Sequence, residues 1–347
     1  MLYRLFTRRF LFLFNPELSH NLVLNLVKLI FLFPGFSYLL RKYYVIRNKK
    51  LNKKVFGLSF QNPVGLAAGF DKNAEVFNEF ASFGFGFIEI GTVTPVAQLG
   101  NDQPRLFRVK KDQALINRMG FNNDGVEKIV KRLKKKSTNI IIGGNIGKNK
   151  ITPNDIASQD YIKCFKKIAP FVDYLVLNIS SPNTPGLVQL QNKSYLQHLL
   201  SVVQDLNLNT YKKPMLIKIS PDLSFGQIDE ILDLINEFKI DGIIATNTSS
   251  LRDDLHTSKN IIHNIGPGGL SGKPIHQKSI KVVSYISKKT KKLLPIIAVG
   301  GIMNSNDAVS MIRAGASLVQ IYTGFIYSGP SLVKRINKKI LEENLNC

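Results

Sequence analysis

Cysteine is almost absent from this chain of 347 residues. The two cysteines, Cys164 and Cys347, are too few for a disulfide framework or a multi-thiolate metal site, so we predict neither disulfides nor a bound metal. Cys347 is the last residue and Cys164 lies in an amphipathic stretch. Both features favour a reducing compartment.

Acidic residues are also scarce, with 24 Asp and Glu against 47 Lys and Arg and a formal net charge of +23. Such an excess of positive charge can favour binding to nucleic acid, to a membrane surface or to anionic ligands. However, 35 of the basic residues are lysines, spread along the whole chain beside asparagine and isoleucine, which indicates compositional drift. Because no helix-turn-helix, finger or RNP pattern accompanies them, we predict no nucleic-acid partner.

Long hydrophobic runs are missing as well. The longest, residues 29–40, is about twelve residues and contains Pro34 and Gly35, whereas a spanning helix needs roughly 20 apolar residues. No small-residue cleavage site follows this run, so a secretory signal is not predicted either. The overall composition, 44% hydrophobic and 20% charged, is that of a globular chain with one large or two ordinary domains.

Residues 1–54 form a segment that is both basic and apolar. They contain eleven Lys or Arg and one acidic residue, Glu17, for a net charge of +10. The pattern predicts one helix from Pro16 to near Pro34 and a second over residues 36–44. The apolar face of the first helix contains Leu18, Leu22, Leu26, Leu29 and Ile30. Apolar side chains flanked by basic ones are typical of a helix in a membrane interface, and the alternative is a helical cap on the main domain.

Eight short runs rich in β-branched residues follow, each succeeded by a helical or loop stretch. They are residues 64–69, 85–91, 140–147, 174–180, 215–220, 242–248, 296–301 and 318–324. Each is almost continuously apolar, as expected of a strand buried on both faces. This alternation predicts a (β/α)8 TIM barrel over residues 55–347, with residues 1–54 as a helical extension. A doubly wound sheet is disfavoured, because no Gly-x-Gly-x-x-Gly turn follows the first strand.

In barrels of this kind the chemistry lies at the carboxyl ends of the strands. Lys218 stands between two isoleucines in a buried strand and needs an anionic partner, for which a reduced flavin is the candidate. Lys72 follows small residues that let a flat ligand approach the backbone. Glycines after the seventh and eighth strands are typical of a phosphate cradle. A phosphate site, a buried cation and a flat pocket together indicate FMN.

The loop at residues 178–186 is rich in proline, serine and asparagine and presents Ser181. It contains no histidine or acidic residue, and none of the five histidines of the chain lies in a nucleophile-elbow context, so a Ser-His-Asp hydrolase is disfavoured. A serine can still transfer a proton where its site is arranged for it. The asparagines near Gly120 offer the donors and acceptors that an amide-bearing ring needs.

In combination, these motifs resemble dihydroorotate dehydrogenase over about residues 1–335. The matching stretches are Gly-Phe-Asp-Lys ending at Lys72, Asn-Arg-Met-Gly-Phe-Asn-Asn at 117–123, Asn-Ile-Gly-Lys-Asn at 145–149, Asn-Ile-Ser-Ser-Pro-Asn-Thr-Pro-Gly at 178–186, Ile-Ala-Thr-Asn-Thr at 244–248, Gly-Gly-Leu-Ser-Gly at 268–272 and Val-Gly-Gly-Ile at 299–302. A serine at position 181 and an N-terminal extension resemble the class 2, membrane-associated, quinone-reducing branch. The soluble class 1 enzymes use cysteine and lack the extension.

The resemblance implies an enzyme that oxidises dihydroorotate to orotate with one FMN per subunit and reduces a membrane quinone. Ser181 would be the catalytic base for the C5 proton while hydride leaves C6, with Thr184 and Phe121 around the proton exit. The implied FMN-binding residues are Ala68, Gly69, Phe70, Asp71, Lys72, Thr92, Asn145, Asn178, Lys218, Thr246, Gly272, Gly301, Tyr322 and Thr323. The implied substrate-binding residues are Lys72, Asn117, Arg118, Met119, Gly120, Phe121, Asn178, Asn183, Asn247 and Thr248. Residues His20, Arg108 and Tyr322 would line the path of the quinone.

The resemblance also carries expectations about location and partners. Mitochondrial members have a targeting sequence and a spanning helix before the extension, and this sequence shows neither, so we expect a bacterial enzyme. It would be a monomer on the cytoplasmic face of the cell membrane. Two alternatives stay open: a soluble FMN barrel that reduces fumarate or NAD, and a non-enzymatic, nucleic-acid-directed protein with a charge of +23.

Overall fold

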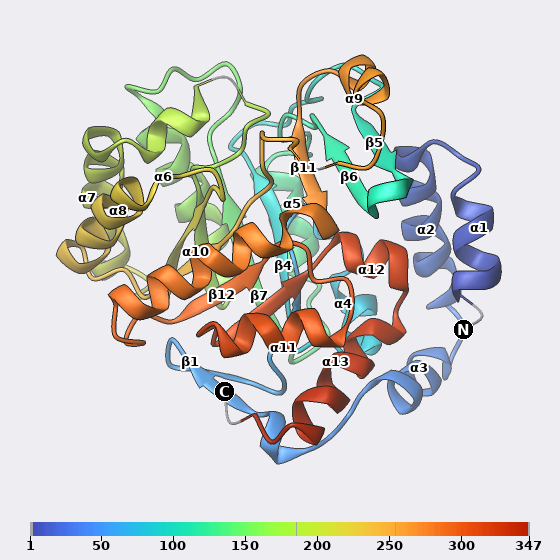
Figure 1. Cartoon of the computed structure of the whole chain (residues 1–347). Coiled ribbons are helices and arrows are strands. Elements are labelled where there is room, and N and C mark those ends of the chain that lie inside the picture. The colour runs from blue at the N-terminus through green and yellow to red at the C-terminus, as the bar shows by residue number, and fades with distance from the viewer. Residues whose placement is uncertain (1–2, 185, 254, 346–347) are drawn as a thin grey trace.

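The computed structural model describes residues 3–184, 186–253 and 255–345, so that Pro185 of the predicted loop and Cys347 lie outside it. Eight parallel strands close into a barrel, which confirms the predicted fold (Figure 1). In order around the barrel they are β10 (Gly242–Ala245), β12 (Ile296–Val299), β13 (Leu318–Ile321), β3 (Val64–Leu66), β4 (Phe87–Val93), β7 (Ile141–Ile146), β8 (Tyr174–Asn178) and β9 (Met215–Ile219). Each strand overlaps one predicted apolar run. Because all are parallel, their carboxyl ends meet at one face.

Strand β9 shows how the barrel sorts its side chains. Ile217 and Ile219 belong to the large core cluster between the strands and the surrounding helices. Leu216, one position along, belongs to the cluster inside the barrel. Since side chains alternate along a strand, Lys218 points inward as Leu216 does, one layer nearer the carboxyl end. An apolar strand thereby delivers a single cation to the barrel interior.

Helices surround the barrel, with short helical turns between them (Figure 1). The helices are α4 (Phe77–Phe80), α5 (Val126–Leu133), α6 (Ala157–Ile168), α7 (Lys193–Leu208), α8 (Phe225–Glu237), α9 (Lys259–Ile265), α10 (His276–Lys289), α11 (Ser305–Arg313), α12 (Thr323–Ser328) and α13 (Ser331–Glu342). The short turns are Lys49–Leu51, Ala81–Phe83, Lys110–Asp112, Ala169–Phe171, Leu187–Gln191 and Lys273–Ile275. Helix α8 starts at a capping box, in which Ser224 and Gln227 each accept the other's backbone N–H.

Small sheets cover the two ends of the barrel. At the amino-terminal end, β1 (Lys53–Val55) pairs antiparallel with β2 (Leu58–Phe60), and Val55 and Phe60 pack into the barrel interior. The predicted domain boundary after Lys54 falls inside β1. At the carboxyl end, β5 (Leu106–Val109), β6 (Ala114–Asn117) and β11 (Gly269–Gly272) form an antiparallel sheet from the loops after β4 and β10.

The N-terminal extension is helical, as predicted. A π-helical turn, Tyr3–Thr7, leads into α1 (Arg8–Leu11), α2 (Pro16–Ile30) and α3 (Phe36–Tyr44). Helix α2 begins where expected, because the Asn15 side chain accepts the Glu17 N–H and proline occupies the first helical position. Arg108 of β5 fixes the corner between α1 and α2, since its guanidinium donates to Phe14 O at 2.6 Å and Ser19 Oγ at 2.9 Å.

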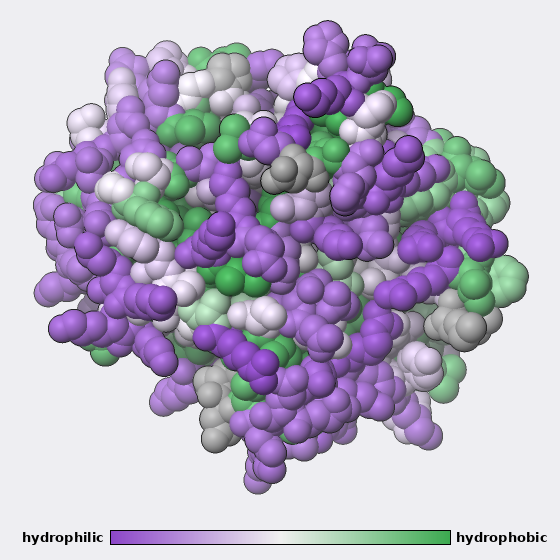
Figure 2. Space-filling model, in the orientation of Figure 1, coloured by the Kyte–Doolittle hydropathy of each residue, from purple (hydrophilic) through white to green (hydrophobic). Residues whose placement is uncertain are grey.

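Helix α2 has apolar side chains on two faces. Leu24 is buried against the core cluster of the barrel. The predicted leucine face points the other way, with Leu18, Leu22, Leu26 and Leu29 between 45% and 56% exposed. Figure 2 shows apolar side chains along the edge of the molecule where α1 and α2 lie in Figure 1. Within the part of the chain that the structure describes, no helix has the length and apolarity to cross a bilayer.

Candidate active site

A cavity opens above the carboxyl ends of the barrel strands and contains most of the predicted residues. The predicted residues in its wall are Ala68, Gly69, Lys72, Thr92, Asn117, Met119, Gly120, Phe121, Asn178, Ser181, Asn183, Lys218, Thr246, Asn247, Thr248, Gly272, Gly301, Tyr322 and Thr323. They come from every part of the barrel sequence. Closure of the barrel therefore assembles the site, since no single segment contains it.

A buried carboxylate lies at the base of this site. Glu89 of β4 is fully buried, and its two oxygens accept hydrogen bonds from Asn145 Nδ2 at 2.8 Å and Gln320 Nε2 at 2.6 Å. The Lys218 ammonium lies 3.7 Å from Glu89 Oε1. Lys218 thus has an anionic partner within the protein, and its predicted role beside a reduced flavin stays a prediction.

The same carboxylate orients the polar wall through a chain of side chains. Asn145, held by Glu89, accepts a hydrogen bond from Thr92 Oγ1 at 2.6 Å. Thr92 Oγ1 in turn accepts from Asn178 Nδ2 at 2.8 Å, and Asn178 Oδ1 accepts from Asn247 Nδ2 at 3.3 Å. Each amide has its orientation set by the next, so the wall presents fixed donors and acceptors to a ligand.

Lys218 keeps its donors available to a ligand. Its side chain is 7% exposed and lines the cavity, and none of the hydrogen bonds among the described residues uses its ammonium group. Gln320 also lines the cavity and has a buried Oε1 without a partner among the described residues. The available ammonium of Lys218 is consistent with a site built for a polar or anionic ligand.

Glycines and hydroxyls form a cradle at the ends of β11, β12 and β13. Gly301 has φ +69°, and a Cβ there would lie 2.6 Å from His276 Cα. Gly272 has φ +98°, and a Cβ there would lie 2.4 Å from Gln113 O. The hydroxyls of Ser271 and Thr323 are 2.9 Å apart beside them. Only glycine allows this backbone approach, and the resulting N–H and O–H groups suit a phosphate.

Ser181 lines the same cavity from the loop after β8. It is 6% exposed, and its Oγ accepts the Asn183 N–H at 3.3 Å. Asn183 Nδ2 donates to Asn117 Oδ1 at 2.9 Å, which ties the loop to β6. Among the described residues no histidine or carboxylate contacts the Ser181 hydroxyl. The arrangement therefore matches no hydrolase triad.

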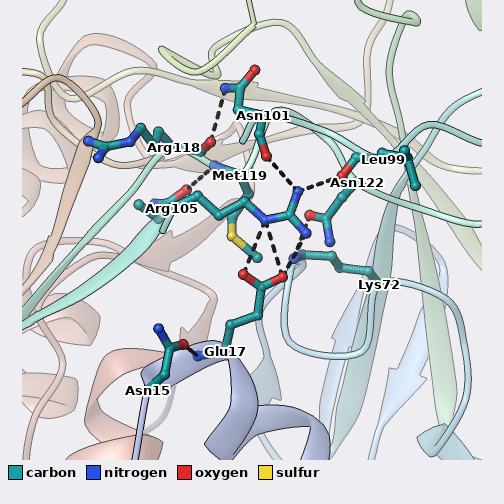
Figure 3. A network of polar contacts seen from close by, with 10 residues as sticks. Asn15, Glu17, Lys72, Leu99, Asn101, Arg105, Arg118, Met119 and Asn122 are labelled. Carbon is teal, nitrogen blue, oxygen red and sulfur yellow. Dashed lines mark hydrogen bonds and ion pairs between the residues drawn. The ribbon is translucent and has the colours of Figure 1, made fainter. Parts of the chain in front are cut away.

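Lys72 faces the cavity beside these amides. Its ammonium donates to Asn122 Oδ1 at 2.9 Å (Figure 3). Desolvation in the pocket lowers the pKa of Lys72 to about 8, while the nearby Glu17 carboxylate raises it and Arg105 lowers it. The lysine is thus a cation at neutral pH that loses its charge under mildly alkaline conditions, and it can attract a carboxylate ligand only while it is charged.

Several predicted residues lie outside the cavity wall. Asn145 stands directly behind Thr92, as described above. The Asp71 carboxylate accepts the N–H groups of Glu75 at 2.7 Å and Val76 at 2.9 Å, which shapes the turn after β3. Arg118 points away, donating to Pro267 O at 3.0 Å and stacking 4.5 Å from the Phe107 ring centre. A direct ligand contact by Asp71 or Arg118 stays a prediction.

The wall also contains Gly300 and Gly324, which belong to the glycines expected to form a phosphate cradle after the seventh and eighth strands. The wall residues that the sequence did not assign to a ligand are Ala67, Leu106, Leu115, Ser271, Ile275, Val299, Ile302 and Gln320. Glu89 beneath the wall was also missed, although the sequence held a signal. It is an acidic residue between two isoleucines in an apolar run, which is the feature that singled out Lys218.

The predicted quinone-path residues lie where α2 meets the barrel. The His20 ring is 5.1 Å from Phe70, which is 5.5 Å from the Tyr322 ring. Burial lowers the pKa of His20 to about 4 and raises that of Tyr322 to about 12, so both are neutral near pH 7. Arg108 holds the corner between α1 and α2. Phe70, predicted to bind the cofactor, thus packs between the extension and the cavity.

Comparisons with known proteins identify the family of this chain. The family model for dihydroorotate dehydrogenase matches residues 50–344. The chain is 50% identical to "Dihydroorotate dehydrogenase (quinone)" of Christiangramia forsetii over 99% of this chain and 100% of that one, and 46% identical to the protein of that name in Trichodesmium erythraeum over 96% and 92%. A crystal structure of ligand-free DHODH from Eimeria tenella is similar with a TM-score of 0.84 and 38% identity, over 94% of this chain and 95% of that one. The chain therefore belongs to the dihydroorotate dehydrogenase family, and within it to the class 2, quinone-dependent branch.

Proposed function

We propose that this protein oxidises (S)-dihydroorotate to orotate with bound FMN and transfers the electrons to a membrane quinone, in the de novo synthesis of UMP. The observation that carries the proposal is that Ser181, Lys72 and Lys218 line the same cavity, together with several asparagines. The names of the relatives agree with this activity.

The cavity fits FMN by its chemistry. The glycine cradle and the Ser271 and Thr323 hydroxyls suit the phosphate, and Lys218 suits the pyrimidine edge of the flavin, where charge develops on reduction. The predicted cofactor residues in the wall would hold one FMN per chain. When bound, FMN accepts hydride from the substrate and releases electrons to a second acceptor.

Ser181 is the proposed base for the C5 proton of dihydroorotate. A hydroxyl is a weak base by its ordinary pKa, so the surroundings must activate it. The Asn183 N–H already fixes the Oγ position. Thr184 is buried in the same loop, and its Oγ1 has no partner among the described residues. It is proposed to relay the proton, accepting one from Ser181 while it gives up its own. The wall asparagines and Lys72 would hold the amide groups and carboxylate of the substrate.

The extension, residues 1–54, is proposed to dock on the cytoplasmic face of a bacterial cell membrane, with the barrel, residues 55–347, as the catalytic unit. Its exposed leucine face suits the apolar layer of the lipid, and its charge of +10 suits anionic headgroups. The neutral rings of His20 and Tyr322 beside Phe70 would then line the quinone path. The chain is proposed to act as a monomer.

An acceptor panel tests this proposal against the soluble alternative. FMN-loaded protein is supplied with dihydroorotate and either a long-chain quinone in anionic vesicles, fumarate or NAD. We expect turnover with the quinone, at least about tenfold above the other two acceptors. Equal or faster turnover with fumarate or NAD would replace the quinone assignment, and binding of nucleic acid without any flavin chemistry would replace the enzyme assignment.

A further inference from the structure

The extension contains one acidic side chain among its eleven basic ones, and that side chain is committed to the barrel. Glu17 lies in the first turn of α2. Both oxygens of its carboxylate accept a hydrogen bond from Arg105 Nε at 3.1 Å, and Oε1 also accepts one from Arg105 Nη2 at 2.7 Å (Figure 3). The side chains are 14% and 9% exposed, so solvent screens the pair only weakly.

The other end of the Arg105 guanidinium holds a loop of the substrate side. Its Nη1 donates to Leu99 O and to Asn101 O at 2.8 Å. Arg105 therefore bridges α2 and residues 99–101 with one rigid planar group. A change in the position of α2 would therefore displace Arg105 and, with it, this loop.

Asn101 carries the connection to the cavity wall. Its Nδ2 donates to Asn183 O at 3.1 Å and to Arg118 O at 2.9 Å. Its own N–H donates to Met119 O at 3.1 Å. Asn183 in turn donates its N–H to Ser181 Oγ. Continuous contacts thus run from Glu17 of the extension to the proposed catalytic base and to the substrate wall.

Glu17 also acts on the pocket through its charge. Its carboxylate favours the protonated form of Lys72, whereas Arg105 disfavours it. His20 of α2 is the other titratable side chain of the extension beside Lys72; burial and the Lys72 ammonium lower its pKa to about 4, so the imidazole adds no charge near neutral pH. Glu17 is therefore the one extension side chain of the described residues that both supports the substrate loop and helps to keep Lys72 charged.

Other contacts of the extension reach different parts of the barrel. Tyr3 OH donates to Ile326 O at 2.7 Å, and Arg8 Nη1 donates to Tyr327 O at 3.1 Å, both in α12. Lys28 pairs with Glu75 near the far end of α2. These contacts fasten the extension without touching residues 99–101 or 181–183, and Lys28 offers a matched control.

We propose that Glu17 is a positioning residue for substrate binding: through Arg105 and Asn101, the docked extension holds the Ser181–Asn183 loop in its substrate-binding arrangement. The extension then serves substrate affinity as well as access for the quinone. This inference rests on the proposed function, because it assumes that orotate binds in this cavity.

The test measures the Kd of orotate for the oxidised, FMN-loaded full chain, followed by the change in flavin absorbance across pH 6–10. We expect Glu17→Gln to raise this Kd at least about fivefold, at the lower end of couplings between sites, and to move the alkaline loss of binding to lower pH. Asn101→Ala keeps the ion pair, so it should raise the Kd to a similar extent and leave the pH dependence in place. Lys28→Gln should stay within about twofold of wild type.

The inference is overturned if Glu17→Gln binds orotate within about twofold of wild type, or if Lys28→Gln weakens binding as much as Glu17→Gln does. Should Glu17→Gln fail to fold, Asn101→Ala alone decides, and wild-type affinity in that variant rejects the route through Asn101. A wild-type protein that holds FMN but binds no orotate would instead reject the proposed function.

Discussion

The Lys218–Glu89 pair allows a test of whether Lys218 stabilises the fold, assists flavin reduction, or does both. Lys218→Met leaves the fully buried Glu89 carboxylate without its counter-charge. Breaking a buried pair in this way costs about 3–5 kcal/mol of unfolding free energy. At the ~2 °C per kcal/mol expected of a large domain, the Tm should fall by about 6–10 °C. The variant should also retain FMN poorly and reduce it slowly.

A second substitution separates the two roles of the lysine. Glu89→Gln in the Lys218→Met background removes the uncompensated charge. The new amide can still bond both neighbours, because Gln320 has an unpartnered Oε1 and can turn its amide to accept. The double variant should therefore recover most of the lost Tm. Flavin reduction should remain slow, since the cation proposed for the pyrimidine edge of the reduced ring is still missing.

The assays are thermal melts of the FMN-free and FMN-loaded proteins and anaerobic stopped-flow reduction by dihydroorotate. Lys218→Met with wild-type Tm would refute the burial argument. Full FMN content and wild-type reduction rate in Lys218→Met would refute the role of the lysine at the flavin. A double variant that recovers the reduction rate together with the Tm would show that Lys218 only balances Glu89.

Three further outcomes follow from the site. Ser181→Ala should keep FMN and orotate binding and lose about 10²–10⁴-fold in the rate of flavin reduction, and a rate within about twofold of wild type in stopped-flow measurements would remove it as the base. Orotate affinity should fall as pH rises past about 8, because Lys72 then loses the charge that attracts the carboxylate; a Kd that does not change between pH 7 and 9.5 would contradict this. A chain starting at Asn52 should still reduce a soluble dye, with a raised KM for dihydroorotate, while losing vesicle co-sedimentation and quinone reduction; unchanged sedimentation would make the extension a packing cap.

The sequence predicts the architecture well because strands buried on both faces are continuous apolar runs. All eight barrel strands overlap predicted runs, and α2 and α3 begin at Pro16 and Phe36 as expected. The carboxyl-end rule of the barrel then assigns Lys72, Ser181 and Lys218 to one face before any contact is known.

Side-chain direction in irregular segments is less accessible to sequence reasoning. Met119 lines the cavity whereas its neighbour Arg118 points toward Pro267, and no periodicity distinguishes the two in a loop. Ion pairs between residues far apart in the sequence are equally difficult to predict. Glu89 meets Lys218 because of barrel closure, and Glu17 meets Arg105 because α2 docks beside β5. These partners follow from tertiary geometry, and only the need for a partner is visible in the sequence.

Anaerobic reduction of the bound flavin by dihydroorotate tests the central claim most directly. The FMN-loaded wild-type chain is mixed with dihydroorotate in the absence of oxygen, and the flavin absorbance bands are followed before and after a quinone in vesicles is added. The account predicts that dihydroorotate bleaches the bands, that orotate appears in equal amount, and that the quinone restores them. Bands that persist in excess dihydroorotate, in a protein that retains FMN, would contradict it.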